Sequence, residues 1–280
     1  MSKRKEVKLA YCTLYNAGDL MNVDIVEKLG HCSVKKSATI PADMTAIGGQ
    51  LYGLQYSDKL AKRILQRVAG AACDARPIYI WGSGFLHDRN KRGLSRKNIR
   101  VCALRGRRSQ EKLRKLTGVF HDVPLGDAGL LVDQLIDTAA AVEKKYQIGL
   151  IPHMYQQQEK KMREIMAMPN VHMIDIKRTP QEVALDMLQC EVILSSSLHG
   201  LIFADALHIP NLHIKGENDL PEGNFKFEDY YSSYGLEDQI FDVTRDEPEV
   251  QKIQTAYCID PLEVEKKKQQ LIACFPIKNS

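Results

Sequence analysis

The sequence predicts an α/β fold built on two open parallel sheets, and three observations lead to it. Short β-rich runs alternate with longer helical patterns along all 280 residues. Strands that alternate with helices form parallel sheets with helices on both faces. The alternation falls into two series that meet near residues 137–147, and a chain of this length divides comfortably into two domains of about 140 residues.

The first series predicts a sheet that begins close to the N-terminus. We expect strands over 7–14, 45–47, 77–81 and 99–104, and helices over 23–29, 57–72 and 109–116. The helix over 57–72 is the most clearly periodic of these, because its apolar residues recur at helical spacing. They share one face of the helix: Leu60, Ile64, Leu65 and Val68.

The second series repeats the pattern. We expect strands over 147–151, 171–176, 191–194 and 211–215, and helices over 157–168, from 179, over 197–207 and over 261–275. Thr179 followed by Pro180 and Glu182 is typical of a helix start, with the threonine as cap and the proline in the first turn. Met162, Ile165 and Met166 are expected to point inward from the helix over 157–168.

These series predict two Rossmann-like domains, residues 1–140 and 141–280, that face each other across a cleft. This is the layout of a GT-B glycosyltransferase. The last helix is expected to be able to pack back on the first domain. A single large domain is the alternative, and a solenoid is disfavoured because the sequence has no short-period repeat.

Composition limits the classes of protein that fit. No apolar run reaches the roughly 18 to 20 residues that span a bilayer, and the charged start Met1–Glu6 lacks the apolar core of a secretory signal. The seven cysteines are scattered and form no CxxC pair, so we expect reduced thiols in a cytoplasm. No clustered ligand set for a metal is visible, and we expect neither a metal nor a cofactor.

Positive charge is concentrated in one block. Residues 87–117 contain twelve Lys or Arg and two Asp or Glu, a balance of +10 in a chain of net charge +4, which leaves −6 for the rest. Such a block attracts phosphate, carboxylate, an acidic membrane or nucleic acid, unless it is simply a solvated surface. Nucleic acid is the least favoured partner, because the block has no interleaved aromatic residues.

Ligands in open parallel sheets bind where the strands end and lead into helices. In the first series these positions carry Asn16, Gly18 and Asp19, then Ser83 between two glycines, then Arg105, then Asp127. An arginine at a strand end, just before a helix, can meet a carboxylate or phosphate with two parallel hydrogen bonds. Ordinary turns and helix caps are the alternative interpretation, above all for Asp127.

The second series carries the strongest signal. His153 follows the strand over 147–151, and on its own it is more typical of a structural histidine. The apolar strand over 191–194 leads into Ser195-Ser196-Ser197, and His199 lies in the first turn of the next helix. Free N–H groups and the positive end of the helix dipole suit an anion there, and His199 is placed to donate a proton.

Five segments together resemble the polysaccharide pyruvyl transferase family. They are Asn16-Ala17-Gly18-Asp19, Arg105 to Ser109, Gly126-Asp127, Pro152-His153, and the serine turn that leads through Leu198 to His199-Gly200. They occur in the family's order over residues 16–207. Two departures stand out: Ala128 replaces a proline, and Ser197 stands where many members have arginine. The missing positive charge is then expected from Arg105 or Lys226.

The resemblance implies the transfer of a pyruvyl group from phosphoenolpyruvate onto two hydroxyls of a sugar, as a cyclic ketal. It implies His199 as the catalytic acid and Asp19 or Asp127 as the group that orients or deprotonates the hydroxyls. The implied substrate-binding residues also include Asn16, Gly18, Ser83, Arg105, His153, Ser196, Ser197, Leu198, Gly200 and Lys226.

The implied acceptor is a hexose, most simply galactose, on a lipid diphosphate, in capsular or exopolysaccharide synthesis. The basic residues from Arg89 to Lys115 would then meet the cytoplasmic face of the inner membrane. A nucleotide-sugar glycosyltransferase of the same shape is the rival interpretation. It needs an acidic residue for the ribose late in the chain, and Glu217 or Asp219 could serve.

Overall fold

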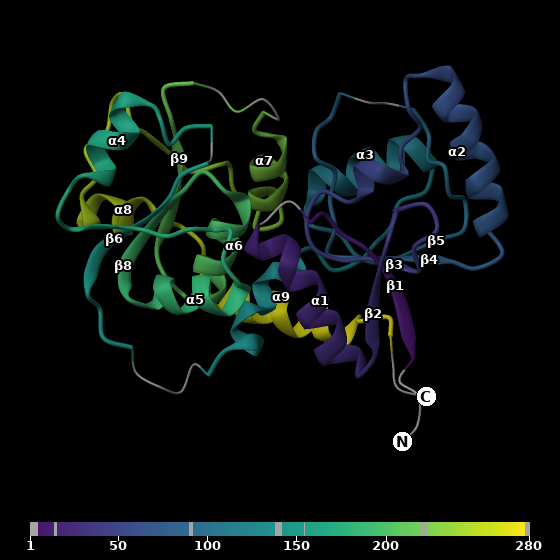
Figure 1. Ribbon diagram of the computed structural model, residues 1–280, viewed down its shortest axis with the longest axis horizontal. Coiled ribbons are helices and arrows are strands. Elements are labelled where there is room, and N and C mark those ends of the chain that lie inside the picture. The colour runs from purple at the N-terminus through teal and green to yellow at the C-terminus, as the bar shows by residue number, and fades with distance from the viewer. Residues whose placement is uncertain are drawn as a thin grey trace.

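The protein folds into two parallel sheets with helices around them (Figure 1). The computed structural model describes residues 5–13, 16–89, 92–137, 142–153, 155–218, 220 and 223–277. The first sheet has the order β2-β1-β3-β4-β5 and the second the order β10-β9-β8-β6-β7, with every pairing parallel. This confirms the predicted α/β class with two parallel sheets.

The strands are short. Those of the first sheet are β1 (Glu6–Ala10), β2 (Ser33–Ser37), β3 (Met44–Thr45), β4 (Ile78–Trp81) and β5 (Ile99–Ala103). Those of the second sheet are β6 (Tyr146–Ile151), β7 (Val171–Met173), β8 (Cys190–Ser195), β9 (Asn211–Lys215) and β10 (Ile240–Asp242).

The helices follow the strands in both halves of the chain. The α-helices are α1 (Ala17–Gly30), α2 (Leu60–Cys73), α3 (Arg107–Thr117), α4 (Lys160–Met166), α5 (Pro180–Leu188), α6 (Leu198–Ala206), α7 (Phe225–Ser232), α8 (Val250–Ala256) and α9 (Pro261–Ala273). The described residues also include two 3₁₀ helices, η1 (Leu51–Leu54) and η2 (Ala128–Leu135).

Most predicted elements are confirmed, with shifted ends. The first strand stops at Ala10 rather than at 14, which lies outside the described residues. Helix α1 begins at Ala17, earlier than the expected 23, because the Asn16 side chain accepts the Gly18 N–H and caps the helix. The Thr179 cap, with its reciprocal bond from Glu182, forms as predicted. Strands β2 and β10 and helices α7 and α8 were not predicted.

A continuous apolar core lies between the two sheets and joins them. Helices α1, η2, α6 and α9 contribute to it, and η2 contacts the other three. Met21, Leu130, Phe203 and Leu271 are fully buried within this core. In Figure 1, α1 and α9 both lie in the lower middle of the molecule, between the two sheets. The two series of strands are therefore held by shared packing.

Two late elements also contact the first sheet. The Trp81 indole at the end of β4 donates to the Leu271 carbonyl in α9, at 2.8 Å. Helix α7 follows β9 in the chain but packs on α3, where Asp229 pairs with Arg105 at 2.9 Å. The polypeptide thus returns to the first sheet twice, and the division at residue 140 stays a prediction.

Within the part of the chain that the structure describes, no helix is both long and apolar enough to cross a membrane. The same residues include no group of three His, Cys, Asp or Glu side chains arranged to hold a metal ion.

Met162 and Ile165 point inward from α4 and are buried, as predicted, and Met166 is partly buried against the same apolar cluster.

Candidate active site

A cavity of about 490 Å³ opens where the strands of both sheets end. Its walls come from the loop before α1, the turn after β3, the loops after β6 and β7, and the first turns of α6 and α7. The backbone N–H of Ala17 donates to the Ile176 carbonyl at 2.7 Å, which ties the first strand exit to the exit of β7. Residues from both series therefore meet in one place, as the strand-exit argument predicts.

His199 is the second residue of α6 and lines this cavity. Its Nδ1 is 3.0 Å from the Asn16 side-chain oxygen. That oxygen also accepts the Gly18 N–H, and the Asn16 amide nitrogen donates to Ser197. Because the Asn16 oxygen can only accept, Nδ1 carries the proton and Nε2 holds a lone pair. Nε2 is buried and has no hydrogen-bond partner among the described residues.

The electrostatic surroundings keep the imidazole neutral. Burial, together with the positive charges of Lys226 and Arg105, lowers the pKa of His199 to about 3. The unliganded protein therefore presents Nε2 as an acceptor at neutral pH. An anion bound beside Nε2 would offset the two cations and raise the pKa of His199 again. Proton uptake and anion binding are thus coupled at this atom.

Gly18 leaves the space that the imidazole fills, and Gly48 lies beside the ring. A methyl group built on Gly18 would lie 2.0 Å from Cγ of His199, inside the ring's own volume. Gly48 has a φ of +89°, which favours glycine. A methyl group on Gly48 would lie 3.6 Å from Oδ1 of Asp19 and 3.8 Å from Nε2 of His199. The space above Gly48 therefore has a carboxylate on one side and the imidazole on the other.

Among the described residues, three cations line the cavity. Arg105 is buried; its Nε donates to Asp229 and one terminal nitrogen donates to the Phe85 carbonyl at 2.6 Å. Lys226 reaches the cavity from the start of α7, and Lys177 from the loop after β7. These residues place positive charge on the same cavity wall that Ser197 lines. Arg105 and Lys226 were expected here from the sequence, whereas Lys177 was not, although it also follows a strand.

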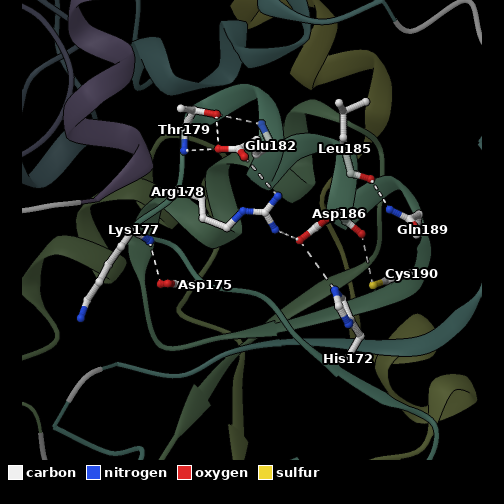
Figure 2. Close-up of polar contacts among 10 residues, drawn as sticks. All are labelled: His172, Asp175, Lys177, Arg178, Thr179, Glu182, Leu185, Asp186, Gln189 and Cys190. Atoms are coloured by element: carbon white, nitrogen blue, oxygen red, sulfur yellow. Dashed lines mark hydrogen bonds and ion pairs between the residues drawn. The ribbon is translucent and has the colours of Figure 1, made fainter.

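The loop that carries Lys177 is fixed by a polar network (Figure 2). The backbone N–H of Lys177 donates to the Asp175 carboxylate, while the Lys177 side chain points away from the other residues drawn in the figure. Next along the chain, Arg178 pairs with Asp186 at 2.5 Å and with Glu182 at 3.5 Å. These contacts join the loop to α5, so that Asp175 and Lys177 are held at the cavity wall.

The structure brings most of the predicted site residues to the cavity. Its wall includes Asn16, Asp19, Arg105, His153, Ser197, Leu198, His199 and Lys226. Gly18 lies against the His199 ring. Residues that the sequence analysis missed also line the wall: Gly48, Gly49, Gln50, Tyr52, Tyr155, Gln157, Asp175 and Lys177.

Four other predicted residues do not line the cavity and support its walls. The Ser83 hydroxyl donates to the Ala46 carbonyl, which ties the end of β4 to that of β3. The Ser196 hydroxyl accepts the His153 N–H at 2.6 Å. A methyl group on Gly200 would lie 2.2 Å from the Ser195 hydroxyl oxygen, so the glycine allows close packing there.

Asp127 is the fourth predicted site residue that does not line the cavity. It is fully buried and caps η2 by accepting the Gly129 N–H at 2.9 Å. Burial raises the pKa of Asp127 to about 6, although the nearby Arg105 charge opposes the shift. Its other carboxylate oxygen has no hydrogen-bond partner within the described ranges. The structure thus places Asp127 as a cap beneath the site, and of the two carboxylates considered for the hydroxyls, Asp19 is the one at the cavity.

Part of the basic block serves the fold, because Arg96, Arg105 and Lys112 are buried, whereas its other described basic residues are exposed. The buried Arg96 side chain pairs with Asp74 at 3.0 Å and also donates to the carbonyls of Ile40 and Arg76. Lys112 is buried and donates to the His87 carbonyl. Asn90 and Lys91 lie outside the described residues, as does Asp219. Glu217 accepts the Lys161 N–H and does not line the cavity.

The fold and the site together define a class of protein. It is an α/β protein with a cationic cavity at the strand ends and a neutral histidine in the cavity wall. Comparison with known proteins gives the family. The model of the family described as polysaccharide pyruvyl transferase matches residues 42–218, and the chain belongs to this family. The resemblance predicted from its motifs is confirmed.

A curated relative is similar to part of the chain. It is the uncharacterized protein L143 of Acanthamoeba polyphaga mimivirus, which is 35% identical over 148 residues. The match covers 50% of this chain, and the chain spans about half the length of that relative.

Proposed function

We propose that this protein transfers the pyruvyl group of phosphoenolpyruvate onto two hydroxyls of a sugar, as a cyclic ketal. One observation carries the proposal. The unpartnered Nε2 of His199 lies in a cavity lined by three cations and opening at the first turn of α6. A small dianion that must be protonated in the reaction fits this arrangement, and family membership supports pyruvyl transfer.

The donor's two anionic groups have separate partners in the proposal. Free N–H groups at the start of α6 favour a phosphate or carboxylate there. Arg105, Lys226 and Lys177 also supply positive charge at the cavity wall. Because Arg105 is already held by Asp229 and the Phe85 carbonyl, it meets the donor in a fixed orientation.

The proposed chemistry proceeds in two steps. In the first, His199 delivers a proton from Nε2 to the methylene carbon, and a sugar hydroxyl forms a C–O bond to the neighbouring carbon. Asp19 takes the proton of that hydroxyl. In the second, another hydroxyl attacks the same carbon, the bond to phosphate breaks, and the second hydroxyl proton leaves with the phosphate. A positioned acid contributes roughly 10²–10⁴-fold to such a reaction.

The position of Gly48 supports this division of roles. The space above Gly48 lies within 4 Å of both Asp19 and His199, so one reacting centre can contact an acid and a base. His199 reaches its acidic form only after the donor binds, because the pKa of His199 is low in the unliganded protein. The donor's own charge therefore prepares the acid that acts on it.

The acceptor we propose is a hexose, such as galactose, that is carried on a lipid diphosphate. We further propose that the two sheets act as the two halves of a GT-B-like enzyme, with the donor bound on the second half. None of the seven cysteines, all of which lie among the described residues, forms a disulfide, which is compatible with a reducing cytoplasm. No cofactor enters the proposed reaction.

Incubation with phosphoenolpyruvate and simple galactosides tests the proposal. We expect release of inorganic phosphate and a sugar whose mass rises by one pyruvyl ketal. His199→Gln should lower phosphate release by at least about 100-fold, because the acid is lost. His208→Gln, which alters an exposed histidine at the far end of α6, serves as the matched control and should keep normal activity.

Two results would contradict the proposal. One is a normal rate of transfer by His199→Gln. The other is binding of a UDP-sugar, measured by calorimetry, with no binding of phosphoenolpyruvate. The second result would favour the nucleotide-sugar glycosyltransferase, for which no described acidic residue of the 217–219 segment lines the cavity.

A further inference from the structure

Helix α2 turns its apolar face to solvent. Leu60, Ile64, Leu65 and Val68 share one face, as the periodicity predicts, and each is between 52% and 69% exposed. Figure 1 places α2 at the outer edge of the first sheet, with no other element beyond it in that view. Singly exposed apolar residues are common, but a stripe of four on one helix marks a contact surface.

The opposite, polar face of α2 holds it to the protein. Gln66 is buried; it accepts the Ser57 N–H at 2.7 Å and donates to the Gln55 carbonyl at 3.1 Å. Gly70 lies against the next loop so closely that a methyl group there would be 1.7 Å from the Ser95 carbonyl oxygen. Because these contacts require Gln66 and Gly70 to face inward, the helix cannot rotate to bury its apolar stripe.

Basic residues border the exposed stripe. Helix α2 contains Lys62, Arg63 and Arg67 and no acidic residue. At 100° per residue, Lys62 and Arg67 fall on opposite sides of the stripe. An apolar stripe between cationic borders is typical of a helix that lies in the interface of a bilayer and attracts anionic headgroups.

We propose that α2 docks this protein on a membrane that carries anionic lipids. A second copy of the chain is a poorer occupant, because two such helices packed face to face would bring only like charges together. The stripe is also confined to one helix of 14 residues. An anionic bilayer instead satisfies the apolar stripe and its cationic borders at once.

The position of α2 connects this surface to the cavity. Helix η1 contributes Tyr52 and Gly53 to the cavity wall, and only residues 55–59 separate η1 from α2. Docking through α2 would hold that wall near the lipid surface, where a lipid-linked acceptor lies. This last link rests on the proposed function, whereas the docking surface itself does not.

Co-sedimentation with vesicles tests the inference. We expect the protein to bind vesicles of phosphatidylcholine mixed with phosphatidylglycerol, and to bind pure phosphatidylcholine far less. The triple variant Ile64→Gln, Leu65→Gln and Val68→Gln should lower the partition coefficient by about tenfold or more. Lys62→Glu with Arg67→Glu should abolish the preference for anionic vesicles. Leu262→Gln, which removes an exposed leucine from α9, is the matched control and should bind normally.

Equal binding by the wild type and the triple variant would overturn the inference. So would dimerisation that the triple variant abolishes, in a protein that does not bind vesicles. All variants should release phosphate from phosphoenolpyruvate with a soluble galactoside at the wild-type rate. A failure of docking is therefore distinguishable from a failure of the proposed chemistry, which the soluble assay reports separately.

Discussion

Gly18 determines how closely the first strand exit approaches His199. The Gly18 N–H donates to the Asn16 side chain that caps the helix. The imidazole ring of His199 occupies the space that a side chain on Gly18 would need. A glycine in the first turn of a helix costs helix stability relative to alanine, so packing against the ring is the physical reason for it here. The same residue thus serves the cap and the site.

Gly18→Ala should therefore disable the site while the protein stays folded. The new methyl group would displace the His199 ring, and a misplacement of about 1 Å typically costs about 100-fold in rate. We expect phosphate release to fall by at least that factor. Gly93→Ala is the control, because a methyl group there meets its nearest atoms only at 4.0 Å. A fully active Gly18→Ala enzyme would show that the ring's position does not matter.

The site residues show what sequence reasoning can and cannot separate. Asn16, Arg105 and His199 were predictable, because polar residues at strand exits converge in a parallel sheet. Ser83 and Asp127 sit at the same kind of position, but they satisfy backbone groups, and no local pattern distinguishes the two uses. Deciding between them requires the three-dimensional partners.

At the scale of elements, α7 is the piece that links the two series at the cavity. Asp229 accepts hydrogen bonds from Arg105 and from both the N–H and the hydroxyl of Ser109. Both ends of the Arg105–Asp229 pair are almost completely buried. Three residues before Asp229, Lys226 lines the cavity. One buried pair thus positions two of the three cations.

Asp229→Asn should destabilise the protein and weaken donor binding together. Removing one partner of a buried pair leaves the other charge uncompensated, at a cost of about 3–5 kcal/mol. Chemical denaturation measures that loss, and calorimetry with phosphoenolpyruvate measures the affinity. Glu228→Gln is the matched control on the same helix: its pair with Arg108 is exposed and worth no more than about 1 kcal/mol. Equal stability of both variants would contradict this role of α7.

Elements with strong periodicity were predictable, whereas those fixed by tertiary contacts were not. Strand β9 was predicted at its observed limits, Asn211–Lys215, because it is a short run bounded by turn signals. Strand β2 has the sequence SVKKS and lies at the sheet edge, where lysines are tolerated and the apolar signal is weak. Helix α7 forms against α3 through Asp229, a contact no local pattern reveals.

At the scale of the whole molecule, the two sheets share a central core and a cavity, and each sheet also has an apolar cluster of its own. Helices α1, η2, α6 and α9 pack between them, so the cavity walls are fixed by the same packing that stabilises the fold. The sequence predicts two series of strands but not the core that they share. The apolar face of a helix that packs between two sheets has the same sequence pattern as the face of a helix that covers a single sheet.

The most direct measurement is calorimetric titration of phosphoenolpyruvate into the wild-type protein in buffers of different ionisation enthalpy. The pKa of His199 is about 3 without ligand and should rise when a dianion binds. Between those two values binding takes up a proton, so affinity should weaken as pH increases. We predict uptake of close to one proton at mildly acidic pH, and its loss in His199→Gln. Binding without proton uptake, or uptake that survives in His199→Gln, would contradict the account.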